Sequence, residues 1–272
     1  MHSSGAQIQA AIFDWAGTTI DYGSLAPMRV FVEIFKRRGV EIAIEEARGP
    51  MGRAKHEHIA EVCRVPRVAA KWREVHGREP DENDVRTMYD EFLPLQKSVL
   101  GDGWELIPGV IQTMANLRSR GIRIGSTTGY TRALMEVVAP RAARLGYAPD
   151  CLVCADDVTA GRPAPWMNFR AAELLAIYPP SAIVAVDDTP VGIEAARNSG
   201  MWAVGVARTG NEFGLAETDA DALEESNPEE FEIRLERAAD TLRNAGAHFV
   251  IDGVAGLPTL LDTIAEYAPP LT

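Results

Sequence analysis

Aspartates stand at the ends of two short apolar runs of this sequence. Asp14 stands where the run 8–15 breaks into a Gly/Thr-rich segment, while Asp187 and Asp188 follow the run 182–186. If both runs are parallel strands, these carboxylates meet at the carboxyl edge of one sheet. Like charges brought together need a cation, and oxygen ligands with no His or Cys nearby favour Mg²⁺. The sequence therefore predicts Asp14 and Asp188 as Mg²⁺ ligands, although Asp14 taken alone is more typical of a turn cap.

Two other segments carry groups that bind phosphate oxygens. The segment Gly125-Ser-Thr-Thr-Gly129 ends an apolar run with hydroxyls and backbone amides that lead toward a helix. Arg162 lies in Gly161-Arg-Pro-Ala-Pro165, just before a helix that begins with proline. A Ser/Thr cluster is commonly only a turn, and such an arginine commonly faces water, so each signal is weak alone. Together with the two aspartate segments they predict a phosphate site that contains Thr128 and Arg162.

The elements that must position these residues are short strands separated by helices. Six apolar runs rich in Val and Ile alternate with stretches in which apolar residues recur three and four apart. Runs that are apolar on both faces are typical of parallel strands covered by helices on both sides. We therefore predict an α/β fold with a doubly wound parallel sheet and a Rossmann-like core. The runs are residues 8–15, 122–127, 151–154, 182–186, 203–206 and 249–251.

One connection between these runs is unusually long. Roughly a hundred residues separate the first two runs, whereas a crossover connection needs only about a dozen. The intervening segment has helical periodicity and no strong strand pattern, which predicts a helical domain inserted after the first strand. An insertion at the carboxyl end of a sheet is well placed to act as a lid over a ligand. The predicted division is an α/β core of residues 1–21 and 101–272 and a helical cap of residues 22–100.

Composition narrows the classes of function. The 272 residues include 27 Lys plus Arg and 39 Asp plus Glu, for a formal net charge of −12, which disfavours nucleic acid as a partner. No apolar run reaches the ~18 residues of a membrane span, and the first residues lack a signal-peptide pattern, so we expect no membrane association. Three cysteines are too few for a disulfide framework, which favours a cytoplasmic location.

The order of these segments resembles a known superfamily. DxxGT, then Ser/Thr after the second strand, then a basic residue before PxP, then DD resembles the four motifs of the haloacid dehalogenase (HAD) superfamily. That resemblance spans nearly the whole chain and implies that Asp14 is a nucleophile and Mg²⁺ the cofactor. Four stretches are further similar to the phosphonatase family: Phe13-Asp-Trp-Ala-Gly-Thr-Thr19, Pro50-Met-Gly-x-x-Lys55, Gly125-Ser-Thr-Thr-Gly-Tyr-Thr131 and Ala160-Gly-Arg-Pro-x-Pro-Trp166.

The phosphonatase resemblance fits the residue two positions after the nucleophile. HAD phosphatases resemble one another in having an acid there, but this chain has Ala16, and loss of a general acid costs roughly 10² to 10⁴ in rate. A carbon leaving group needs an electron sink instead, such as a protonated imine on a lysine. On spacing alone Lys55 is typical of a solvated helix face. The resemblance implies that it forms the imine and that His58 aids proton transfer.

The resemblance implies further roles. The Ala16 carbonyl would complete the protein part of the metal shell, and Met51 and Tyr130 would lie near the bound substrate. The implied reaction is hydrolysis of the phosphorus–carbon bond of phosphonoacetaldehyde to acetaldehyde and phosphate, in the degradation of 2-aminoethylphosphonate. A homodimer that pairs through the inserted helices is implied as well. Some phosphonatases have a second acid where this chain has Gly192, and whether Asp187 replaces it is left open.

Two other functions compete with this hypothesis. One is a conventional HAD phosphatase that acts on a small phosphate ester, against which Ala16 argues. The other is a catalytically dead HAD domain that binds a phosphorylated ligand or protein. The joint presence of Asp14, Lys55, Arg162 and Asp188 argues against the second.

Overall fold

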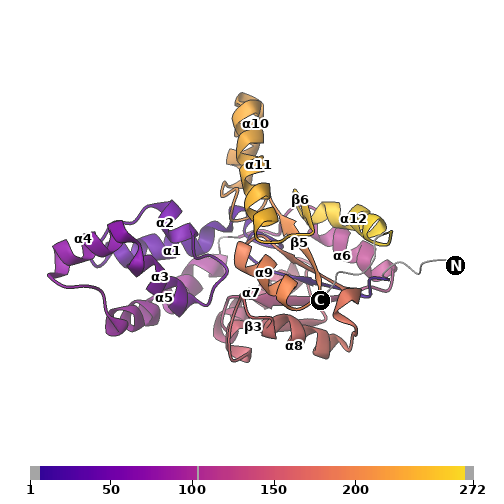
Figure 1. Ribbon diagram of the computed structural model, residues 1–272, viewed down its shortest axis with the longest axis horizontal. Helices are drawn as coiled ribbons and strands as arrows, with labels where there is room; N and C mark the ends of the chain where they lie inside the picture. Colours follow the sequence, from indigo (N-terminus) through magenta and orange to yellow (C-terminus); the bar gives the residue numbers. More distant parts are fainter. Residues whose placement is uncertain (1–6, 103, 267–272) are drawn as a thin grey trace.

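The computed structural model describes residues 7–102 and 104–266, and its centre is a six-stranded sheet (Figure 1). All neighbouring strands run parallel, in the order β3-β2-β1-β4-β5-β6. This confirms the predicted doubly wound parallel sheet, and each apolar run contains or overlaps a strand. The strands are β1 (Ala10–Phe13), β2 (Arg123–Thr128), β3 (Cys151–Cys154), β4 (Ile183–Asp187), β5 (Trp202–Val206) and β6 (Phe249–Ile251).

Helices cover both faces of the sheet because successive strand residues point to opposite sides. Phe13 and Val186 pack on one face against α6 (Val110–Ser119), α7 (Arg132–Arg144) and α12 (Leu257–Ile264). Ile12 and Ala185 pack on the other face against a second set of helices. That set is α8 (Trp166–Leu175), α9 (Pro190–Asn198), α10 (Glu217–Ser226) and α11 (Pro228–Asn244). Central strands are thus apolar on both faces, as their sequences indicate.

Five helices form a separate layer beside the sheet, at the left of Figure 1. They share an apolar cluster of their own, centred on side chains such as Phe31, Trp72 and Phe92. No strand lies in residues 22–100, all of which the structure describes. The helices are α1 (Leu25–Lys36), α2 (Ile44–Arg48), α3 (Lys55–Arg64), α4 (Pro66–His76) and α5 (Glu82–Asp102). We call this layer the cap; its division from the core at residues 22–100 stays a prediction.

The chain enters the cap through a tight linker. Asp21, Gly23 and Ser24 all have positive φ, of 56°, 76° and 53°. The Asp21 carboxylate accepts hydrogen bonds from the backbone N–H of Ala26 at 3.1 and 3.3 Å, near the start of α1. This geometry turns the chain from the end of β1 into the cap within a few residues. None of the described helices combines the length and the apolar character that crossing a membrane requires.

The separate apolar cluster predicts that the cap can be destabilised by itself. Trp72 is almost fully buried between cap helices and touches Phe35 and His76. Trp72→Ala should therefore cost the cap about 3–5 kcal/mol of stability. Hydrogen exchange should then speed up in α1 to α5 and stay at the wild-type rate in β1 and β4. Leu257→Ala, which opens the core beside the sheet, is the matched control with the opposite pattern, and equal loosening of cap and sheet by Trp72→Ala contradicts the division into two domains.

Candidate active site

Three carboxylates meet at the carboxyl edge of the sheet, beyond β1 and β4. Asp14 directly follows β1, Asp187 ends β4, and Asp188 comes next. The backbone N–H of Asp14 bonds the carbonyl of Val186 at 2.9 Å, so the parallel register itself sets the two strand ends side by side. One carboxylate oxygen from each aspartate lies within 4.8 Å of the others, and all three residues are buried. The predicted convergence of Asp14 and Asp188 is confirmed.

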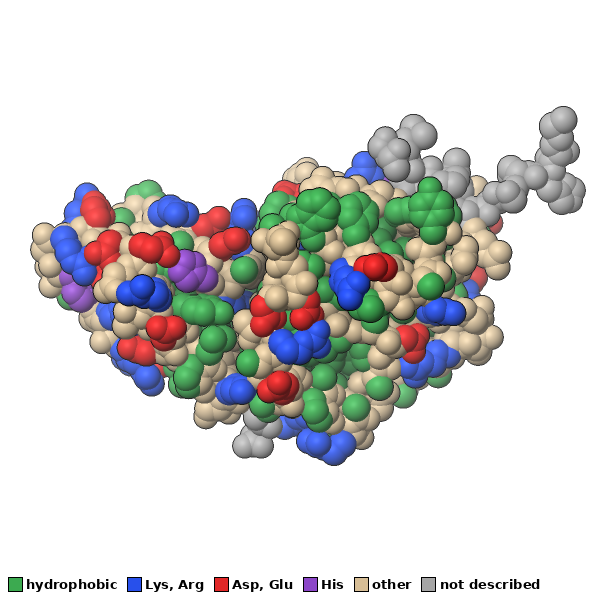
Figure 2. Space-filling view, turned by 90° about the horizontal axis from the view of Figure 1, so that it is seen from below, with side chains coloured by type: hydrophobic (Ala, Val, Ile, Leu, Met, Phe, Trp, Pro, Cys, Tyr) green, Lys and Arg blue, Asp and Glu red, His purple; other side chains and the backbone are tan. Residues whose placement is uncertain are grey.

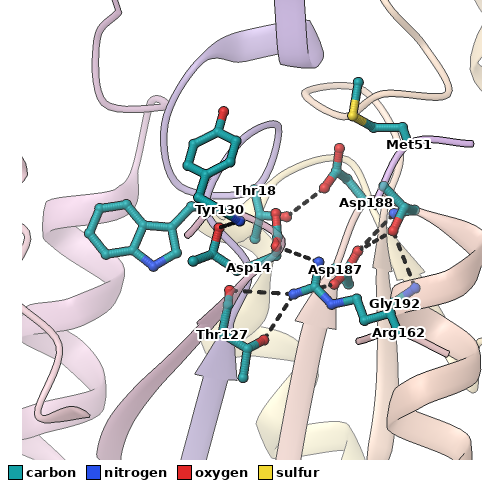
Figure 3. A network of polar contacts seen from close by, with 12 residues as sticks. Asp14, Thr18, Met51, Thr127, Tyr130, Arg162, Asp187, Asp188 and Gly192 are labelled. Atoms are coloured by element: carbon teal, nitrogen blue, oxygen red, sulfur yellow. Dashed lines mark hydrogen bonds and ion pairs between the residues drawn. The ribbon is translucent and has the colours of Figure 1, made fainter. Parts of the chain in front are cut away.

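Arg162 lies between two of these carboxylates (Figure 3). Its Nη1 is 2.7 Å from Asp14 Oδ1, its Nη2 is 3.1 Å from Asp187 Oδ2, and Nη2 also donates to Thr127 Oγ1 at 2.9 Å. Burial alone would lower the pKa of the guanidinium, but Asp187 and Asp14 raise it above its ordinary value. Arg162 therefore stays charged and offsets part of the negative charge of the aspartates. It is buried at the site and does not face water, as an arginine before a helix commonly does.

Asp188 is held from two loops. Thr18 Oγ1 donates to its Oδ1 at 3.1 Å, and the backbone N–H of Asn211 donates to its Oδ2 at 2.7 Å. A Cβ on Gly17, whose φ is +84°, would lie 2.0 Å from Asp188 Oδ2. Glycine is therefore required at position 17 both by the left-handed backbone and by the close approach of the carboxylate.

The charge balance of the cluster fits a divalent cation. Burial raises the pKa of Asp14 to about 7; Arg162 opposes this shift and Asp187 adds to it. Burial, followed by repulsion from Asp14 and Asp187, raises the pKa of Asp188 well above its ordinary value. Burial and mutual repulsion both disfavour the charged carboxylates, and a bound cation would offset both effects. A donor set of carboxylate oxygens suits a hard cation such as Mg²⁺.

The carboxylate of Asp187 occupies the space that a side chain at position 192 would take, and that position is a glycine. Its Oδ1 accepts hydrogen bonds from the backbone N–H of Thr189 at 2.9 Å and from Thr189 Oγ1 at 2.7 Å. A Cβ on Gly192 would lie 1.9 Å from the carboxyl carbon of Asp187. A side chain at 192 and the carboxylate of Asp187 therefore exclude each other in this geometry.

A narrow pocket lies above these groups, between the core and the cap. Its volume is about 20 Å³, which is room for about one water molecule. Core residues on its wall include Asp14, Ala16, Thr128, Tyr130 and Arg162, all predicted from sequence. The cap and linker supply Ser24, Pro27, Met51, Gly52 and Lys55. Position 16 contributes no acid, and the hydroxyl of Thr128 accepts from the backbone N–H of Tyr130 at 3.1 Å.

Lys55, the first residue of α3, points into this pocket and is only 4% exposed. Its Nζ lies 5.5 Å from the ring centroids of Phe31 in the cap and Tyr130 in the core, and 3.9 Å from Met51 Sδ. Burial lowers its pKa to about 8, and Asp14 opposes part of the shift. Across the described residues no carboxylate forms an ion pair with it. The solvated helix face that the spacing alone favours is therefore wrong.

His58 lies one turn after Lys55 but does not line the pocket. Its ring stacks on Phe31 at a centroid distance of 3.8 Å, and its Nε2 bonds the carbonyl of Ala47 at 2.7 Å. Because a carbonyl can only accept, Nε2 must carry the hydrogen. Burial, followed by the charge of Lys55, lowers the pKa of His58 well below its ordinary value. The ring is thus neutral with its lone pair on Nδ1, which has no hydrogen-bond partner among the described residues.

Sequence reasoning missed two contacts of Asp188. Thr18 belongs to the segment after β1 but was not singled out, and Asn211 lies in a loop after β5 that carries no motif. The signal that could have found Asn211 is its place between Gly210 and Gly214, beyond the carboxyl end of another strand.

Known proteins share this architecture and sequence. The sequence model of the haloacid dehalogenase-like hydrolases matches residues 8–200. A phosphonoacetaldehyde hydrolase of Paraburkholderia phytofirmans is 49% identical, over 96% of this chain and 97% of that protein. The chain belongs to the phosphonoacetaldehyde hydrolase family of haloacid dehalogenase-like hydrolases. This confirms the resemblance inferred from the four motifs.

Two further members of the phosphonoacetaldehyde hydrolase family are informative. A bifunctional phosphonoacetaldehyde hydrolase/aminoethylphosphonate transaminase of Clostridioides difficile is 44% identical over 94% of this chain and 40% of that protein. The crystal structure of a phosphonoacetaldehyde hydrolase-like protein from Oleispira antarctica superposes with a TM-score of 0.92, at 40% identity, covering 97% of this chain and 95% of that one. The likeness to that structure covers the cap as well as the core.

The carboxylate cluster predicts a binding constant that can be measured without turnover. Asp188→Asn keeps the shape of the side chain and removes one negative charge, so Mg²⁺ titrated into the protein in a calorimeter should bind more than about tenfold more weakly. Asp219→Asn, on the exposed face of α10, is the control and should bind as the wild type does. An unchanged affinity in Asp188→Asn would move the cation to the other two aspartates.

Proposed function

We propose that this protein hydrolyses the phosphorus–carbon bond of phosphonoacetaldehyde to give acetaldehyde and phosphate. The observation that carries the proposal is the buried amine of Lys55 in the same pocket as Asp14, with no acid at Ala16. The name of the P. phytofirmans relative supports the substrate. The C. difficile relative, whose name joins the hydrolase to an aminoethylphosphonate transaminase, supports a place in 2-aminoethylphosphonate degradation.

The first half of the reaction is assigned to the cap. The neutral amine of Lys55 attacks the aldehyde carbon and water leaves, which gives an imine that is protonated on nitrogen. A pKa of about 8 leaves part of this amine neutral at physiological pH, whereas an ordinary lysine would be almost fully charged. The Nδ1 lone pair of His58 is the base that we assign to the proton transfers around Lys55. Met51 and Tyr130 form the wall against which the two-carbon chain lies.

The second half of the reaction is assigned to the core. Asp14 attacks phosphorus, the oxygen–phosphorus bond forms as the phosphorus–carbon bond breaks, and the electron pair of the broken bond becomes an enamine on Lys55. Arg162 and Thr128 bind the phosphoryl oxygens. Protonation of the enamine carbon and addition of water release acetaldehyde, and a second water hydrolyses the aspartyl phosphate. Asp14, Asp188 and the Ala16 carbonyl would hold Mg²⁺, which when bound neutralises charge on the phosphoryl group.

A conventional phosphatase fits this pocket less well. Hydrolysis of a phosphate ester needs an acid that protonates the departing oxygen. Ala16 lines the pocket and provides none, while Lys55 supplies an amine that an ester has no use for. Assay of p-nitrophenyl phosphate beside phosphonoacetaldehyde distinguishes the two, because comparable rates would favour the phosphatase.

We also propose that the protein forms a homodimer and that its location is cytoplasmic. Large exposed apolar side chains gather in and just after α8, where Trp166 is 48% and Tyr178 is 85% exposed. On the face drawn in Figure 2, hydrophobic side chains gather over the core, while charged side chains prevail on the cap. This apolar surface of the core is a second candidate dimer contact beside the inserted helices that the family resemblance implies. Sedimentation of the wild type beside Trp166→Glu tests the core surface.

The division of labour between Lys55 and Asp14 gives a decisive prediction. Lys55→Arg keeps the charge but cannot form an imine, because a guanidinium is not nucleophilic at neutral pH. Its turnover of phosphonoacetaldehyde should fall by several powers of ten, and borohydride with substrate should no longer label the protein. Asp14→Ala should still be labelled at Lys55 while releasing no phosphate, because imine formation precedes phosphoryl transfer. Mass mapping of the labelled peptide is the measurement.

Two outcomes would contradict this assignment. One is near-normal turnover by Lys55→Arg, and the other is a wild-type label on a different lysine such as Lys71 or Lys97. The initial labelling rate should also rise with pH and level off above about 8, as the amine loses its proton.

We further propose that Asp187 supplies the second acid that some relatives carry at position 192. Asp187→Gly should cost roughly 10- to 100-fold in turnover, because Arg162 loses an ion-pair partner at 3.1 Å. Gly192→Asp alone should also be impaired, since its side chain meets the carboxyl group of Asp187. The double variant Asp187→Gly/Gly192→Asp should recover to within about tenfold of the wild type. A double variant no better than Asp187→Gly sinks the proposal, and circular dichroism of all three confirms that they fold.

A further inference from the structure

Arg48, the last residue of α2, reaches from the cap to the linker and the core. Its Nη1 donates to the carbonyl of Gly23 at 3.0 Å and to the carbonyl and Oδ1 of Asn211 at 2.6 and 3.1 Å, and its Nη2 donates to the carbonyl of Gly214 at 3.2 Å. All four acceptors are uncharged oxygens. The fixed fork of a guanidinium suits several acceptors at once, which the single ammonium of a lysine does not.

The receiving loop, residues 207–214, is shaped around this side chain. Gly214 has a φ of +68°, and a Cβ there would lie 2.6 Å from Cζ of Arg48. Arg234 Nε donates to the carbonyl of Phe213 at 2.6 Å, which fastens the loop to α11. The loop is therefore anchored on the core, and a side chain at position 214 would collide with the guanidinium of Arg48.

The same loop touches the catalytic edge of the sheet. The backbone N–H of Asn211 donates to Asp188 Oδ2 at 2.7 Å, so one residue contacts both Arg48 and a carboxylate of the cluster. Thr209 Oγ1 donates to the carbonyl of Gly17 at 2.9 Å, and the Thr209 carbonyl accepts from the N–H of Gly23 in the linker at 2.8 Å. The loop thus joins the cap, the linker and the segment after the nucleophile.

On the cap side, Arg48 sits where the reactive segment begins. Its carbonyl accepts from the N–H of Met51 at 3.0 Å, and the preceding Ala47 holds His58. Lys55 follows seven residues after Arg48. With about 20 Å³ of space below Lys55, the pocket admits little more than a water molecule. A substrate with a phosphonate group cannot enter unless the cap moves away from the core.

We propose that Arg48 is a positioning residue that latches the cap over Asp14 and, through Asn211, links this closure to Asp188. The inference rests on the proposed function for its kinetic consequence and on the contacts of Arg48 for its structural one. Opening of the cap separates the guanidinium from the loop, and closing restores the contacts that place Lys55 above the nucleophile. Arg48 touches none of the reacting atoms itself.

Hydrogen exchange of the free protein tests the structural part. Arg48→Met and Arg48→Lys should both speed exchange at residues 49–54 and 210–214 by roughly 10- to 100-fold, the factor expected when hydrogen bonds of a charged group are lost. Strands β1 and β4 should exchange as in the wild type. Arg67→Met is the matched control. Arg67 in α4 pairs with Glu46 of α2, the helix that carries Arg48, so the contact lies within the cap and its loss should leave both segments unchanged.

The split between KM and kcat tests the kinetic part. If both Arg48 variants favour the open cap, the closed fraction falls and KM for phosphonoacetaldehyde should rise about 10- to 100-fold, while kcat at saturating substrate changes only a few fold. A merely misfolded fraction would instead lower kcat with KM unchanged, and that result overturns the latch.

Other results also decide the matter. Wild-type exchange in Arg48→Met, wild-type behaviour of Arg48→Lys, or faster exchange spread evenly over the whole cap each overturns the latch. If the wild type fails to hydrolyse phosphonoacetaldehyde, the proposed function falls, while the exchange measurement still tests Arg48 by itself.

Discussion

Three buried carboxylates within 4.8 Å of one another are the constraint that the rest of this structure must satisfy. Charges of one sign placed together away from water are costly unless counter-charge and hydrogen bonds come with them. Arg162 is buried for this reason, and Thr18 and Asn211 donate to Asp188 for the same reason. The remaining negative charge suits this edge of the sheet to a hard cation such as Mg²⁺. The backbone at position 17 comes so close to the Asp188 carboxylate that only glycine fits there.

A second constraint is that both the core and the cap line the pocket. Asp14 belongs to the sheet and Lys55 to the cap, so they face one another only when the cap lies against the core. Burial is the main cause of the lowered pKa of Lys55, and its Nζ lies 5.5 Å from the ring centroids of both Tyr130 in the core and Phe31 in the cap. In the proposed mechanism, the closed cap that buries the amine also leaves too little space for a substrate to enter. Under that proposal, entry and chemistry need different positions of the cap, and contacts between cap and core become part of the mechanism.

The sequence alone predicts the parts of this site that periodicity and strand ends reveal. The six strands, the meeting of Asp14 with Asp188 and the helical character of the inserted segment follow from apolar runs and the positions where they stop. What it could not reveal depends on contacts between distant segments. Asn211 reaches Asp188 from a loop after a different strand, and Arg48 reaches that loop from the cap. Neither leaves a local pattern, because a surface arginine and a loop asparagine have the same sequence signature whether or not they make such contacts.

Asp187 and a side chain at position 192 would compete for the same space at this edge of the sheet. The place taken by the Asp187 carboxylate is the place where a side chain at 192 would begin, 1.9 Å away. The two positions face the same space because β4 ends at Asp187 and α9 begins at Pro190, with Thr189 as the N-cap residue of that helix. Asp187 forms an ion pair with Arg162 at 3.1 Å, so the carboxylate that occupies this space lies beside a guanidinium. Under the proposal that Asp187 replaces an acid at position 192, what this edge of the sheet requires is a negative charge beside Arg162. A one-dimensional motif that demands the acid at a single chain position would then overlook this chain.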